Sequence, residues 1–191
     1  MTNGVFSDFE IDKMSVKFAA ASGASETAIA MNCVGSVEEE LTAKEITKKC
    51  RGVVIKDVVK GTGEGTLTIS AHVPTTIFTK AFGMTQSDLA EGVQAYGSNS
   101  RHKEFCLTMH VLDEDGAEKY KAYPKCIFKA RPKINIENGA EEVAEVEMEI
   151  AVMPDDKGNG MYEALASGLS STITTGWMEN FNYDLVKTAS A

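Results

Sequence analysis

Apolar and polar residues alternate along three segments of the chain. Residues 66–73, 103–112 and 143–153 each place an apolar side chain at about every second position. A period of two over this length is typical of antiparallel strands with one buried face. Three such segments predict an all-β fold, an antiparallel β-sandwich or barrel. A fourth strand is expected over residues 118–130.

The sequence predicts one short helix, over residues 75–82. Pro74 stands where a helix begins and Gly83 where it ends, which is the usual placement of these residues. Ile77 and Ala81 would share one face of this helix. Because so short a helix is unstable alone, we expect it to dock its apolar face onto the sheet.

The segment 36–51 has two interpretations. Ser36 and Glu39 have the spacing of a helical capping box, and acidic and basic residues recur four positions apart. However, the apolar residues form no single helical stripe. The β-branched run 53–59 follows directly, so a long polar hairpin is favoured over a helix. With so few apolar residues, part of that hairpin should project; we expect it to span residues 37–65, with the glycine-rich stretch 61–65 as its flexible tip.

Length and charge narrow the class of protein. The chain has 191 residues, enough for one domain, and a net charge of −9. An acidic protein is a poor candidate for reading DNA sequence, which requires clustered cations. No apolar run approaches the ~18 residues of a membrane span, and acidic residues stand where a signal peptide would be basic and apolar. We expect an N-terminal arm and first strand within residues 1–30, a C-terminal arm over 182–191, no membrane insertion, and synthesis in the cytoplasm.

Two charged rows stand out in the strand patterns. Glutamates occupy alternate positions 145–149, and lysines recur along the strand 118–130, where we expect them to share one face. A glutamate row on a strand diverges in steps of ~7 Å, so it does not converge on a metal ion. The rows are either solvated faces or partners within a sheet or across a subunit boundary. The basic row consists of Lys119, Lys121, Lys125 and Lys129.

The residues that could support catalysis are scattered. The four cysteines lie far apart without a metal-binding spacing, and free thiols are the favoured interpretation. His110 and Cys106 share a strand face but stand roughly 13 Å apart, too far for a nucleophile and its base. We therefore expect neither an enzyme nor a cofactor.

Several stretches, in order along the chain, resemble one family. They are GTGEGTLTISAHVP (61–74), EGVQAYG (91–97), DEDGAEKYKAYPKC (113–126), ENGAEEVAEVEMEI (137–150), YEAL (162–165), and Trp177 with Phe181. The set is similar to the major tail protein, or tail tube protein, of long-tailed phages and prophages of Gram-positive bacteria. The resemblance covers roughly residues 33–181.

This resemblance implies a structural virion protein. Its β-sandwich or barrel, similar to the tube subunit of type VI secretion systems, would form hexameric rings that stack into a tube for DNA ejection. Implied partners are further copies of the chain and the tape-measure, tail terminator and distal tail proteins, in the tail of a virion made in a bacterial host. Alternatives are the tube of a phage-tail-like bacteriocin or, in another class, a carbohydrate-binding β-sandwich.

The tube hypothesis gives the charged segments roles. An acidic lumen would contact passing DNA only by non-specific repulsion. The candidate lumen-facing acids are Glu145, Glu147, Glu149, Glu38 and Glu40. The candidate hairpin residues that reach the next ring are Thr42, Lys44, Lys48, Lys56, Gly61, Gly63, Glu64 and Gly65. The four lysines of the basic row are the candidate interface face.

Overall fold

The computed structural model describes residues 6–20, 26–139 and 141–188; residues 1–5, 21–25 and 189–191, parts of the expected arms, lie outside them. The described chain is all-β, as predicted, and carries a few short helices. The strands are β1 (Glu10–Phe18), β2 (Ile29–Ala30), β3 (Cys33–Cys50), β4 (Val53–His72), β5 (Phe105–Leu112), β6 (Glu118–Phe128), β7 (Val146–Met153) and β8 (Tyr162–Leu165). The helices are α1 (Thr75–Ala81), the 3-10 helix η1 (Ala166–Gly168), α2 (Ser171–Asn180) and α3 (Tyr183–Val186).

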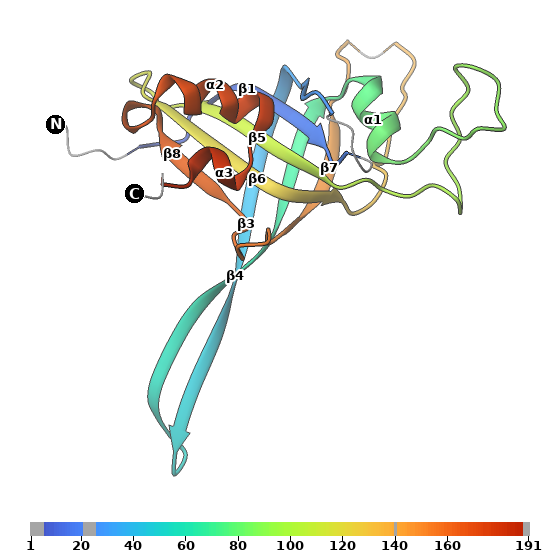
Figure 1. Cartoon of the computed structure of the whole chain (residues 1–191). Helices are drawn as coiled ribbons and strands as arrows, with labels where there is room; N and C mark the ends of the chain where they lie inside the picture. Colours follow the sequence, from blue (N-terminus) through green and yellow to red (C-terminus); the bar gives the residue numbers. More distant parts are fainter. Residues whose placement is uncertain (1–5, 21–25, 140, 189–191) are drawn as a thin grey trace.

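The eight strands of the described residues belong to one antiparallel sheet. Its order is β2-β1-β5-β6-β7-β4-β3, and β8 pairs with β6 beside this path. Side chains from one face of β1, β4, β5, β6 and β7 meet in a single buried cluster, so the sheet curves around its core as an open barrel (Figure 1). The opposite face of β1, β5 and β6 is covered by α2 and α3, whereas that of β7, β4 and β3 is not.

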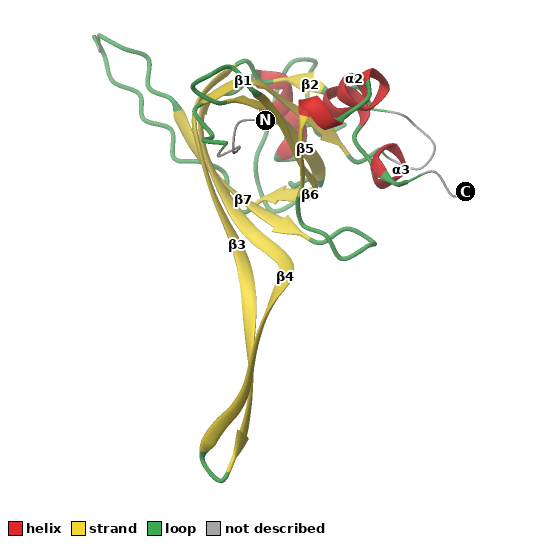
Figure 2. Ribbon diagram, turned by 90° about the vertical axis from the view of Figure 1, so that its left-hand side faces the viewer, coloured by secondary structure: helices red, strands yellow, loops and turns green. Residues whose placement is uncertain are grey.

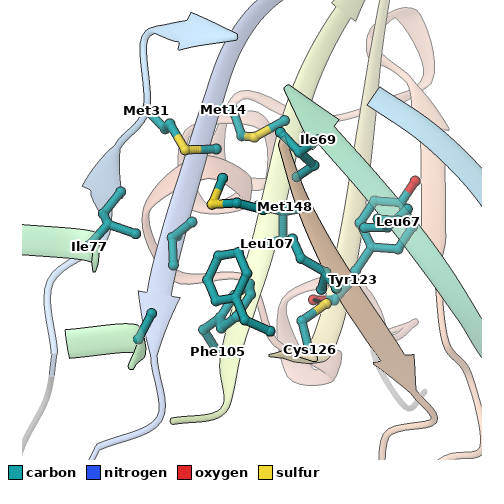
Figure 3. Close-up of a cluster of buried hydrophobic side chains, with 14 of the residues drawn as sticks. Met14, Met31, Leu67, Ile69, Ile77, Phe105, Leu107, Tyr123, Cys126 and Met148 are labelled. Atoms are coloured by element: carbon teal, nitrogen blue, oxygen red, sulfur yellow. Dashed lines mark hydrogen bonds between the residues drawn. The ribbon is translucent and has the colours of Figure 1, made fainter. Parts of the chain in front are cut away.

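The core is built from the alternating positions that the sequence predicted. Leu67 and Ile69 of β4, Leu107 of β5 and Ile150 of β7 are fully buried. Figure 3 shows these strands sending their side chains, with several methionines, toward one another. The strands expected over 103–112 and 143–153 are confirmed to within three residues, as β5 and β7. The strand expected over 66–73 is the inner part of β4, which begins earlier, at Val53.

Helix α1 is confirmed as well. Ile77 and Ala81 are fully buried, and Phe82, which follows the helix, packs its ring against Phe128 at 5.3 Å between centroids. The helix thus closes one end of the barrel with the apolar face that the pattern predicted.

The segment 36–51 is a strand, which settles the ambiguity in favour of the hairpin. β3 pairs with β4 from Cys33↔His72 to Cys50↔Val53, and the outer part of this ribbon extends far from the barrel (Figure 2). The turn at its tip is Arg51-Gly52, with φ angles of 49° and 84°. The charged residues four positions apart did not produce a helix, because they can equally be placed on the two faces of a paired strand.

The prediction that residues 61–65 form the hairpin tip is wrong. They lie within β4, where the hairpin leaves the barrel, and the pairing register shifts there between Leu41 and Ala43. Gly63 has a φ of 76°, and a Cβ at this position would lie 2.7 Å from the carbonyl oxygen of Gly158. The glycines therefore allow a close backbone approach at the root of the hairpin rather than a turn at its end.

The sequence prediction of a single helix is also incomplete. The Ser/Thr-rich stretch forms α2, whose Trp177 is buried against β6 together with Phe181. Part of the expected C-terminal arm is α3, which Asn182 caps by accepting a hydrogen bond from the backbone N–H of Leu185. Apolar residues four apart, at 169, 173, 177 and 181, were the helical signal in this stretch.

Candidate assembly surfaces

The uncovered face of β7, β4 and β3 gathers the predicted acidic residues. Pairing sets Glu149 beside Thr68 and Thr68 beside Glu38, so these side chains share one row across the sheet. Glu147 stands beside Ser70 in the next row, and Glu40 is paired with Thr66. Glu38, Glu40, Glu147 and Glu149 are exposed. We call these four residues, together with Glu145, the acidic face.

Glu145 precedes β7 and reaches β3. Its carboxylate lies against Gly35, where a side chain would overlap it. Among the described residues, the salt bridge on the acidic face is the one between Lys129 and Glu149. Lys129 also donates a hydrogen bond to Thr66, at 2.9 Å. The face therefore presents an excess of carboxylates to whatever lies opposite it.

The four lysines of the basic row do not share one face, so that prediction is wrong. The register between β5 and β6 shifts after the Leu107↔Tyr123 pair, and Cys126 pairs with Phe105. Tyr123 and Cys126, three positions apart, both enter the core. This bulge reverses the alternation: Lys119 and Lys121 lie on the core side, and Lys125 and Lys129 lie on the opposite side.

Lys119 and Lys121 are parts of a partly buried ion network. Asp8 accepts contacts from both, at 2.7 and 3.0 Å, and Lys121 also lies 3.3 Å from Glu39. Tyr123 donates a hydrogen bond to Glu39. Burial alone would raise the pKa of Asp8, but the two lysines outweigh it and hold that pKa below its usual value.

Replacing Asp8 by Asn should destabilise the fold at neutral pH but not in strong acid. A carboxyl with a lowered pKa contributes stability above its unfolded pKa of about 3.9, and this contribution disappears as the pH falls through the folded value. Because the Asp8 side chain is 42% exposed, the loss should stay near or below about 1 kcal/mol. Urea unfolding at pH 7 and near pH 2 measures it. Asp115→Asn, in an exposed turn, is the matched control, and an equal effect of D8N at both pH values would contradict the assignment.

The hairpin has two chemically different faces. Lys44 is paired with Lys60 and Lys48 with Lys56, and the pair Ile46↔Val58 lies between them on the same face. We call these six residues the lysine face. The other face carries Glu45 and the hydrogen bond from Thr47 to Asp57, at 3.0 Å.

The hairpin also exposes apolar side chains. Ile46 is 51% exposed, and Val53 and Val59 are 64% and 70% exposed. Like charges directly opposite one another on a ribbon are destabilising. The exposed apolar side chains and the lysines that face one another are both unfavourable in the free subunit. A partner with acidic and apolar groups would stabilise both.

His110 forms the most developed polar cluster beneath α2, which the sequence did not reveal. Its ring lies 2.8 Å from Asp12 and 3.2 Å from Glu118, and it stacks on Tyr120 at 4.6 Å. The hydrogen bond from His110 lowers the pKa of Asp12. These contacts tie β1, β5 and β6 together, so the cluster has a structural role.

The remaining features that could indicate a function are the cysteines, possible metal-binding groups and the lengths of the helices. Burial raises the pKa of Cys106 to about 12, so its thiol is a poor nucleophile at neutral pH. In the described ranges, no group of three or more His, Cys, Asp and Glu residues could hold a metal ion. Within the same ranges, every helix is too short or too polar to cross a bilayer.

No protein-family model matches this sequence, and no curated protein matches it either. Among solved structures, the chain is similar to a chain of the anti-feeding prophage baseplate, determined by cryo-EM with six-fold symmetrisation: 11% identity and a TM-score of 0.42 over 86% of this chain and 97% of that one. It is also similar to a chain of the cap that terminates the anti-feeding prophage tube, with 9% identity and a TM-score of 0.41 over 86% of this chain and 97% of that one.

Proposed function

We propose that this chain is a structural subunit that assembles with copies of itself into the tube of a phage tail or tail-like particle. The hairpin is the observation that carries the proposal. It extends apolar and paired lysine side chains away from the barrel, where the described residues of its own subunit do not cover them. A surface of this kind is stabilised when a partner covers it. Another copy of this chain can be that partner, because its net charge is negative and complements the lysines.

The hairpin is the element that we assign to the contact between stacked rings. Its outer part, including Lys44, Lys48 and Lys56, would lie on the adjacent ring. The root, with Thr42, Gly61, Gly63, Glu64 and Gly65, would instead set its direction. A repeated contact between unlike patches builds rings and tubes, because each copy offers both patches. We propose hexameric rings, with tape-measure, terminator and distal tail proteins as the other partners.

The acidic face is the surface that we assign to the lumen. Its carboxylates would repel the phosphates of DNA and keep a passing genome from binding the wall. In a bacteriocin tube, which carries no genome, the same assembly would form without this selection on charge. A dependence of DNA passage on lumen charge would therefore favour the tail of a genome-carrying phage.

Reversing charge on this face, by Glu147→Lys together with Glu149→Lys, should slow DNA passage through assembled tubes. Each new cation adds a phosphate contact, so the slowing should be severalfold at low salt and should diminish as salt rises. The measurement is the rate of DNA release from particles at several salt concentrations. Glu114→Lys with Asp115→Lys, a reversal of equal size in the β5–β6 turn, is the control. An unchanged rate and salt dependence would remove these residues from the lumen.

Electron microscopy of the purified protein, with light scattering to give its mass, tests the proposed function itself. Rings or tubes with a central channel are the expected result. A protein that stays monomeric at high concentration and near-physiological salt would overturn the proposal.

A further inference from the structure

The barrel has an opening along one side. β1 and β3 flank a cleft of about 490 Å³, with Phe9 and Ile11 on one wall and Val34 and Val37 on the other. Met109 and Val111 of β5 line it from within the barrel. Asp8, Glu39 and Lys121 of the ion network line it as well, so the cleft has an apolar part and a paired, charged part.

Both walls of this cleft are sheet edges. β3 pairs with β4 on one side and, among the described strands, has no partner on the other. β2 covers only Ser15 and Val16 of β1, so the Glu10 end of β1 is equally unpaired in the described chain. Unpaired edges are templates for a further strand, and an added strand would satisfy their backbone groups.

One exposed segment has the pattern of the missing strand. Residues 133–137, Lys-Ile-Asn-Ile-Glu, alternate apolar and polar positions within the loop between β6 and β7. Ile134 and Ile136 are 47% and 87% exposed, and the segment is assigned to no strand. In Figure 1 this loop, coloured light orange, rises above the sheet, and Arg131 at its base packs over the ring of Phe78 of α1, at 5.4 Å.

We propose that residues 133–137 of one copy occupy the cleft between β1 and β3 of a second copy as an added strand. Ile134 and Ile136 would point inward between Ile11 and Val37, the half-buried apolar residues of the two walls, because alternate side chains of a strand share a face. Lys133 would lie near the carboxylates of the cleft mouth, where Glu10 is exposed. The proposal rests on self-assembly, the proposed function, and adds the contact that joins neighbouring copies.

The hairpin is the less suitable occupant. Each strand of the hairpin is already paired with the other along one edge. A strand that fills a cleft between two unpaired sheet edges must have both of its own edges free. Residues 133–137 meet that condition in the described chain. The hairpin and this loop therefore serve different contacts.

Replacing Ile134 and Ile136 together by Asp tests the energetic part of the proposal. Both residues are exposed in the subunit, so thermal unfolding of the isolated subunit should be unchanged. The protein concentration required for assembly should rise at least roughly a hundredfold, because two apolar anchors are lost. Val143→Asp, in the same loop with 83% exposure, is the matched control and should assemble normally. Normal assembly of the double variant would overturn the proposal.

Disulfide trapping tests the geometry. In a chain with Cys33→Ser and Cys50→Ser, Ile136→Cys is placed in one protein, and Val34→Cys or Val37→Cys in another. Oxidation of the mixture under assembly conditions should give a covalent dimer with at least one of the two pairs, because paired strands bring Cα atoms within disulfide range. Tubes that form without either cross-link would overturn this inference and leave the proposed function intact. An unmodified chain that forms no assembly under the same conditions would overturn both.

Discussion

A chain in which Asn-Gly joins Lys44 directly to Lys60 is expected to fold normally and to form no tubes. These two lysines face one another across the ribbon, so a two-residue turn can close the shortened hairpin without changing its register. Residues 45–59, which the change removes, contribute no buried side chain to either core cluster. Thermal unfolding of the subunit should therefore shift little, whereas assembly, followed by electron microscopy and light scattering, should be abolished.

The matched control keeps the hairpin at full length. Thr47→Ala removes the exposed hydrogen bond to Asp57 and leaves the lysine face unchanged, so tubes should form. Tubes of normal length from the shortened chain would contradict the role assigned to the hairpin. Deleting residues 62–64, from the stretch 61–65 that the sequence suggested as the tip, would be a poorer test, because it would disturb β4 where the hairpin joins the barrel.

Trp177→Ala should be the most destabilising single substitution at the helical layer. The indole ring is 2% exposed and packs on Phe181 and Tyr120, at 4.8 and 5.9 Å between ring centroids. Truncating a buried aromatic residue to Ala typically costs about 3–5 kcal/mol. In a domain of this size, that corresponds to a fall of roughly 10 °C in the unfolding temperature. Circular dichroism is the appropriate measurement, since the variant has lost the chain's single tryptophan.

Trp177→Phe is the control for that experiment. The indole N–H is buried and has no hydrogen-bond partner in the described structure, so Phe removes an unfavourable group while keeping a ring. Its cost should be well below that of Ala. Equal destabilisation by Phe and Ala would mean that the ring's packing does not hold α2 on the sheet.

The parts of the fold that followed from the sequence are those where a single buried face dictates the pattern. β5, β7 and the part of β4 that pairs with β7 send every second residue into the core, so alternation identified them. Helix α1 followed from its flanking proline and glycine and from its apolar face. The alternating glutamates of residues 145–149 were visible in the sequence. That the glutamates of β3 lie on the same face could be seen only from the pairing of β3 and β7 with β4.

The remaining features depend on contacts that a linear pattern does not contain. A bulge between Tyr123 and Cys126 divides the lysines between the two faces of β6, and no charge in the sequence marks it. Helix α2 is rich in Ser and Thr, which favour helices weakly, so its stability comes from docking Trp177. The cleft between β1 and β3 arises from the curvature of the whole sheet.

The root of the hairpin determines the direction in which the hairpin leaves the barrel. A Cβ on Gly160 would lie 2.0 Å from the carbonyl oxygen of Gly63, so the two backbones meet there without any intervening side chain. Asp155 accepts hydrogen bonds from the backbone of Lys157 and Asn159 and so braces the loop that makes this contact. The orientation of the projecting ribbon is thus fixed by main chain against main chain. In a polymer of such subunits, the rise and twist from one layer to the next would depend on this backbone contact between Gly63 and Gly160.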